Sequence, residues 1–75
     1  MKDKALNVFY ELNAIDGNGV WSEIYNRIRD DAITEDDMRF ELRLAFDSVN
    51  GWLEEESTDG RLIRLRNDIV DATKL

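Results

Sequence analysis

Apolar residues recur every three or four positions along three successive segments of the chain, and this spacing restricts the fold more than any other sequence feature. It is the spacing of one face of an α-helix. The segments are residues 4–15, a shorter one from Ser22 to about Asp31, and one from Thr34 to Asn50. The chain contains no proline, whose ring would break a helix from within. Three amphipathic helices are therefore predicted.

The predicted helix boundaries rest on residues that stop or cap helices. The Asp-Gly-Asn-Gly run at 16–19 is typical of a turn, and Asn50-Gly51 is typical of a stop. Val20-Trp21 is expected to be a short apolar step before the second helix, with Ser22 as its cap. The side chains expected to face the core are those of Ala5, Val8, Phe9, Leu12, Ile15, Ile24, Tyr25, Ile28, Met38, Leu42, Ala45, Phe46 and Val49.

The start of the third helix is marked more strongly than the others. Thr34 is expected to be its N-cap, and Asp37 three residues later approximates a capping box. Glu35 and Asp36 are also well placed against the positive end of the helix dipole. These signals predict a helix that begins directly after Thr34.

The pattern changes after Trp52, and two interpretations remain open. The favoured one is a β-hairpin over residues 53–66, turning at Thr58-Asp59-Gly60 with Gly60 at a positive φ. This register would place Leu53 opposite Leu65 in the core. The competing interpretation is a fourth helix, since an apolar row also keeps helical spacing. That row is Leu62, Leu65, Ile69 and Ala72.

The stretch from Val49 to Leu65 carries a family resemblance. A helix is expected to stop at Gly51, an apolar pair then starts a strand, and an Asp-Gly tip leads into a return strand bearing Arg64. Together with the order of the preceding helices, this passage resembles the winged helix-turn-helix family. The resemblance implies a single domain over residues 1–75, mainly α-helical, with three helices followed by a two-stranded wing. Such domains bind DNA and also protein partners.

The residue types missing from the chain restrict its chemistry. The sequence contains no cysteine and no histidine, which excludes disulfides and thiolate metal sites and removes the usual general base. The serines therefore lack a histidine to activate them. We expect no enzyme activity, no cofactor and no metal, and no small-molecule substrate is evident.

One loop partly resembles a calcium-binding loop. Residues 14–25 resemble the middle of an EF-hand loop through Asp16, Asn18 and Trp21. The first ligand position is held by Ala14 and the twelfth, which needs a bidentate glutamate, is held by Tyr25. The segment is therefore expected to be a turn between helices.

Charge and hydropathy indicate the compartment and the class of partner. The net charge is −7, which disfavours nucleic acid as a default ligand and is typical of a soluble surface or of a high-salt cytoplasm. No apolar run is long enough to span a membrane. The charged residues near Met1 do not resemble a signal peptide, so a cytoplasmic protein is expected.

The outer surface of the third predicted helix is the candidate site for binding a partner. A step of about 100° per residue places Asp36, Phe40 and Asp47 opposite the apolar stripe, with Arg43 and Leu44 beside them. An exposed aromatic and aliphatic pair framed by charge is typical of a protein contact. The first hypothesis is a non-catalytic interaction module that binds a second copy or a regulatory protein through this helix.

The alternative hypothesis is a small DNA-binding transcriptional regulator. By resemblance, Arg39 and Arg43 would face the DNA from the third helix, and Arg61 and Arg64 from the wing. Acidic residues oppose this hypothesis, because five of them fall between positions 30 and 37 with no base among them. Nucleic acid therefore ranks second to a protein partner.

Overall fold

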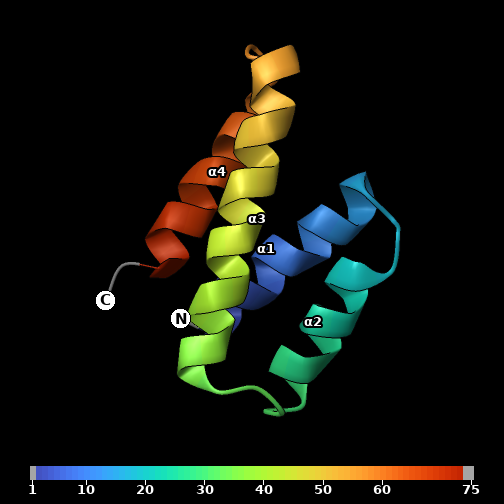
Figure 1. Cartoon of the computed structure of the whole chain (residues 1–75), viewed down its shortest axis with the longest axis vertical. Helices are drawn as coiled ribbons and strands as arrows, with labels where there is room; N and C mark the ends of the chain where they lie inside the picture. Colours follow the sequence, from blue (N-terminus) through green and yellow to red (C-terminus); the bar gives the residue numbers. More distant parts are fainter. Residues whose placement is uncertain (1, 74–75) are drawn as a thin grey trace.

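Four α-helices joined by short turns form the computed structural model, which describes residues 2–73 (Figure 1). The helices are α1 (Lys2–Ile15), α2 (Val20–Arg29), α3 (Glu35–Glu55) and α4 (Gly60–Thr73). No strand occurs within the described residues. The predicted wing is therefore wrong, and so is the winged helix-turn-helix architecture of three helices and a hairpin.

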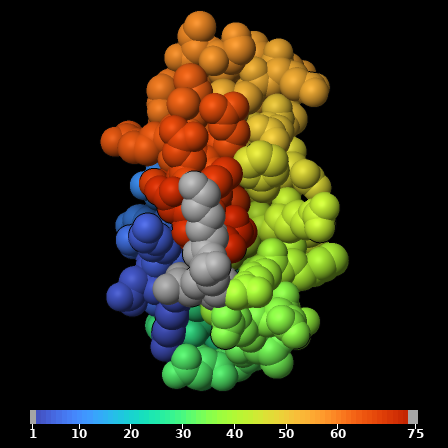
Figure 2. All heavy atoms as spheres, turned by 90° about the vertical axis from the view of Figure 1, so that its left-hand side faces the viewer, coloured from blue at the N-terminus to red at the C-terminus, as the bar shows by residue number. Residues whose placement is uncertain are grey.

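The helices form two antiparallel pairs that meet through α1. α1 packs mainly against α2, and α3 packs along α4. α1 also packs against α4 and touches α3 over a smaller area. Figure 1 shows α3 crossing in front of α1, and Figure 2 shows α4 lying between α1 and α3. The Cα trace measures 35 × 28 × 16 Å, so the molecule is flat and its helices keep broad solvent faces.

One cluster of buried apolar side chains joins all four helices. Each helix contributes residues at three-and-four spacing, as expected for amphipathic helices. Phe9 of α1 and Trp21 of α2 pack with their ring centroids 6.0 Å apart. No polar or charged side chain is buried among the described residues. The core consists of Ala5, Val8, Phe9, Leu12, Trp21, Ile24, Ile28, Met38, Leu42, Ala45, Val49, Leu53, Leu62, Leu65, Ile69 and Ala72.

The start of α2 differs from the prediction. Gly19, not Ser22, precedes the helix as its N-cap, with a left-handed φ of 92°. Val20 and Trp21 lie inside α2 rather than in a step before it. The side chain of Asn18 accepts a hydrogen bond from the Val20 amide at 3.0 Å. Local capping by Asn18 and the conformational freedom of Gly19 thus start the helix three residues earlier than predicted.

The start of α3 follows the prediction, whereas its end does not. The Thr34 hydroxyl accepts a hydrogen bond from the Asp37 amide at 3.1 Å, which confirms the predicted cap. The helix then continues through Asn50 and Gly51 to Glu55. Leu53 stays in phase with Val49 and is buried, and its burial outweighs the poor helix propensity of one glycine.

The segment predicted as a hairpin becomes the end of α3, a turn and α4. Asp59 is the N-cap of α4, because its Oδ1 accepts hydrogen bonds from the amides of Arg61 at 2.9 Å and Leu62 at 3.3 Å. Gly60 is the first helical residue and does not have the positive φ that was predicted. The competing sequence interpretation was correct: its apolar row, Leu62, Leu65, Ile69 and Ala72, is the buried face of α4.

Candidate functional site

The outward face of α3 leaves two large apolar side chains in solvent. Phe40 is 59% exposed and Leu44 is 43% exposed, although the opposite face of the same helix is buried. The exposure predicted for this pair is confirmed. No other part of the described chain covers Phe40 to the extent that would bury it.

Charged residues surround this apolar pair. Asp36, Arg43 and Asp47 are all exposed on α3. Arg43 and Asp47 form no ion pair within residues 2–73. The five residues predicted as a protein contact site therefore lie together on one exposed helix surface: Asp36, Phe40, Arg43, Leu44 and Asp47.

A groove between α3 and α4 borders this surface. Its volume is about 300 Å³. Arg39 and Arg43 line it from α3, so Arg43 adjoins both the groove and the Phe40 side of the helix. The other lining residues are Leu42, Phe46, Ile69, Val70 and Thr73. The sequence analysis missed this groove, since it depends on α4 packing along α3.

The four arginines predicted for DNA contact are distributed over two helices. Arg39 forms an ion pair with Glu35 one turn earlier, at 3.1 Å. Arg61 and Arg64 lie on α4 rather than on a wing. Arg61 is near the start of α4, whereas the groove that Arg39 and Arg43 line reaches Thr73 near its end, about 18 Å away along the helix. Arg61 therefore lies far from the α3 arginines.

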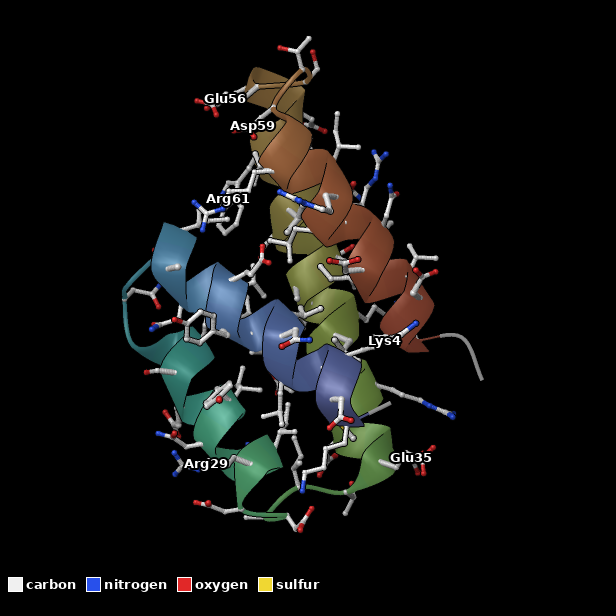
Figure 3. All side chains as sticks on the ribbon, turned by 180° about the vertical axis from the view of Figure 1, so that it is seen from behind. Lys4, Arg29, Glu35, Glu56, Asp59 and Arg61 are labelled. Carbon is white, nitrogen blue, oxygen red and sulfur yellow. The ribbon has the colours of Figure 1, made fainter. Side chains whose placement is uncertain are left out.

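Arg61 borders a second depression, which is polar. Figure 3 shows its side chain directed toward the C-terminal end of α1. The depression has a volume of about 590 Å³. No basic residue occupies the last turn of α1, so Arg61 supplies positive charge near the negative end of that helix dipole. The other lining residues are Ala14, Ile15, Asp16, Trp52, Glu55, Glu56, Asp59 and Leu62.

The loop that partly resembles an EF-hand uses its polar side chains for hydrogen bonds within the turn. The Asp16 carboxylate accepts hydrogen bonds from the Asn18 amide group at 3.2 Å and the Trp21 indole at 3.4 Å. These contacts hold the turn against the start of α2. Among residues 2–73, no group of three or more acidic side chains is arranged to hold a metal ion.

One charged pair at the end of α2 alters the titration of its members. Arg29 donates to the carboxylate of Asp30 from Nε at 3.0 Å and from Nη2 at 3.4 Å. This hydrogen bonding lowers the pKa of Asp30 below its ordinary value and raises the pKa of Arg29. Both groups are exposed, and Figure 3 shows Arg29 at the end of α2.

Two further exposed apolar side chains were not predicted from the sequence. Tyr10 on α1 is 66% exposed and Val20 on α2 is 53% exposed. The Tyr10 ring lies 6.3 Å from the ring of Tyr25 between centroids. Tyr10 falls outside the apolar row of α1, and its exposure could have been predicted from that position. Neither residue has a second large exposed apolar side chain one turn away on its own helix, as Phe40 has in Leu44.

Similarity to known proteins does not indicate what this surface binds. Comparison of the chain with protein families, characterised proteins and solved structures found no match. None of the helices in the described part of the chain is both long enough and apolar enough to cross a membrane.

Proposed function

We propose that this protein is a non-catalytic interaction module that binds a protein partner through the outer face of α3. The observation that carries the proposal is the exposure of Phe40 and Leu44 on a helix whose opposite face is already buried. An exposed aromatic side chain with Arg43 beside it has the composition that protein interfaces favour. We keep the cytoplasm as the proposed compartment, which cell fractionation would test.

Charge and chemistry support a protein partner over the alternatives. The net charge of −7 opposes phosphate backbones, and Arg39 is already paired with Glu35. Catalysis is disfavoured because the sequence offers no histidine or cysteine and no charged side chain is buried among residues 2–73.

Position-specific photo-cross-linking in living cells tests the proposal. A photoreactive residue is placed at Leu44, and a matched control is placed at Asn67, an exposed position on α4. We expect protein cross-links from position 44 and none from position 67. Adding Phe40→Ala to the first variant should remove the cross-links while far-ultraviolet circular dichroism stays unchanged.

Two results would contradict the proposal. Cross-linking that is equal at both positions would mean that α3 is not a preferred contact surface. Salt-sensitive binding of the purified protein to mixed duplex DNA, abolished by Arg39→Ala and Arg43→Ala but unaffected by Phe40→Ala, would favour the DNA hypothesis instead.

A further inference from the structure

Gly51 lies in the last third of α3 on its exposed side, and nothing inside the molecule requires a glycine there. Its φ is not positive, and an added Cβ would meet no atom within 4 Å. Alanine would favour the helix more strongly than glycine does. A glycine on the outside of a helix does, however, allow another surface to approach the backbone closely.

Gly51 continues the row that contains the exposed apolar pair. Phe40, Leu44, Asp47 and Gly51 are separated by four, three and four residues, so they form one row along α3. We call this row the outer stripe. All four residues are exposed. A step of about 100° per residue centres the outer stripe opposite the buried face of α3, so it is the part of the helix that a second molecule reaches most easily.

The outer stripe is complementary to itself when it is reversed. Its midpoint falls between Leu44 and Asp47, close to the middle of α3. In an antiparallel pair of α3 helices centred there, Phe40 of each copy lies over Gly51 of the other, where no side chain blocks the ring. Leu44 of each copy then lies beside Asp47 of the other.

The charges of Arg43 and Asp47 also favour this antiparallel register. Arg43 lies on the flank of the outer stripe and is within one residue of the level of Asp47 on the opposite copy. Neither side chain forms an ion pair within residues 2–73. A twofold axis would make this contact twice, as in any isologous interface. Two Arg43–Asp47 pairs would then flank two Phe40 rings.

We propose that the outer stripe of α3 binds a second copy of this chain, in an antiparallel homodimer with Phe40 over Gly51 and Arg43 paired to Asp47. This inference rests on the proposed function, because it names the partner of the same surface.

The size of the contact indicates a weak dimer. A contact of one helix from each copy falls below the roughly 1,200–2,000 Å² that stable complexes bury. The single chain exposes 4819 Å², close to the value of about 4,800 Å² for a compact monomer of this length. The monomer thus exposes no more surface than a compact monomer of this length does. The dimer therefore forms reversibly at high concentration.

Sedimentation equilibrium on the purified chain, from about 10 µM to about 1 mM, tests for the dimer. We expect a monomer–dimer equilibrium that Phe40→Ala weakens by about tenfold or more, as expected for an interface anchor. Gly51→Ala should raise the thermal midpoint yet weaken association. The matched control Asn67→Ala, an exposed change on α4, should leave association unchanged.

Charge reversals test the register separately from net charge. Arg43→Asp and Asp47→Arg change the net charge in opposite directions, so general repulsion would weaken one dimer and strengthen the other. The proposed pairing requires both single variants to weaken the dimer and the double variant to restore it. Arg64→Asp on α4 is the control for charge alone.

Cysteine pairs test the direction of the helices, since the natural chain has no cysteine. Oxidising a mixture of the Leu44→Cys and Asp47→Cys variants should yield mainly the mixed disulfide. A predominance of Leu44→Cys homodimers would indicate parallel helices and overturn the register.

The outcomes separate this inference from the proposed function. A chain that remains monomeric at every concentration overturns the homodimer, whereas photo-cross-links from Leu44 to a different protein would leave the interaction module standing. The proposed contact is also overturned if neither single charge reversal weakens the dimer, or if the double reversal does not restore its affinity.

Discussion

Lys2 and Asp31 join the start of α1 to the end of α2, with Nζ 2.8 Å from Oδ1. Asp31 makes this contact from a left-handed backbone with φ 54°, the one positive φ of a non-glycine residue among residues 2–73. The amides of Asp31 and Ala32 donate to the carbonyls of Ile28 and Arg27. This is the hydrogen-bond pattern of a Schellman motif, where glycine is the usual residue.

Replacing Asp31 with glycine should relieve this backbone strain. An L-residue in the left-handed region costs about 1 kcal/mol, while the exposed ion pair contributes at most about 1 kcal/mol. In a Lys2→Ala background, where no ion pair is lost, we expect Asp31→Gly to raise the free energy of unfolding by about 0.5–1 kcal/mol. Urea denaturation measures this difference, and a loss of stability in that background would contradict the assignment of strain.

Leu42 and Leu44 form a matched pair of substitutions on one helix. Leu42 is fully buried and Leu44 is 43% exposed. Leu42→Ala should lower the free energy of unfolding by about 2–5 kcal/mol, because it leaves a cavity in the core. Leu44→Ala should change it by about 0.5 kcal/mol or less, as surface substitutions do. Equal losses in thermal or urea unfolding would mean that α3 is rotated from the orientation described here.

The capping role of Asp59 can be measured directly. Asp59→Ala removes the acceptor for the amides of Arg61 and Leu62 and should lower the free energy of unfolding by about 0.5–2 kcal/mol. Asp59→Asn is the control, since asparagine caps helices about as well. A hairpin turning at Gly60 would instead lose little with alanine at 59, so an unchanged stability would argue against α4 beginning at this residue.

The pKa of Asp30 should depend on Arg29. The side-chain hydrogen bond from Arg29 lowers the folded-state pKa of Asp30 below its ordinary value. The stability contributed by this pair is therefore present above the unfolded-state pKa and is lost as the pH falls through the folded-state pKa. Titration of the Asp30 carboxyl by NMR should give a pKa that rises in Arg29→Gln. An unchanged pKa would show that the pair does not persist in solution.

The helical part of the fold was largely available from the sequence. The apolar rows of α1 and α3 gave their buried faces, and Thr34 gave the start of α3. Asp59-Gly60 misled the prediction because the same dipeptide serves as a hairpin turn and as an N-cap followed by the first helical residue. Glu54 and Glu55, which favour helix over strand, were the local evidence that α3 continues past Gly51.

The candidate site could be predicted only where it depends on one helix. The exposure of Phe40 and Leu44 follows from the period of α3 alone. The groove beside Arg43 could not be foreseen, since it exists only where Val70 and Thr73 of α4 pack along α3. Gly51 was taken for a helix stop because a single sequence does not show whether burial of Leu53 will carry a helix past a glycine.

The position of α1 affects how the chain folds as it is made. α1 is the first of the four helices to leave the ribosome, and it packs against α4, the last of them. Until α4 has been synthesised, the part of α1 that α4 will cover has only α2 and α3 as partners. The four-helix core therefore cannot close before α4 has been synthesised, and until then the nascent chain carries uncovered apolar surface on α1.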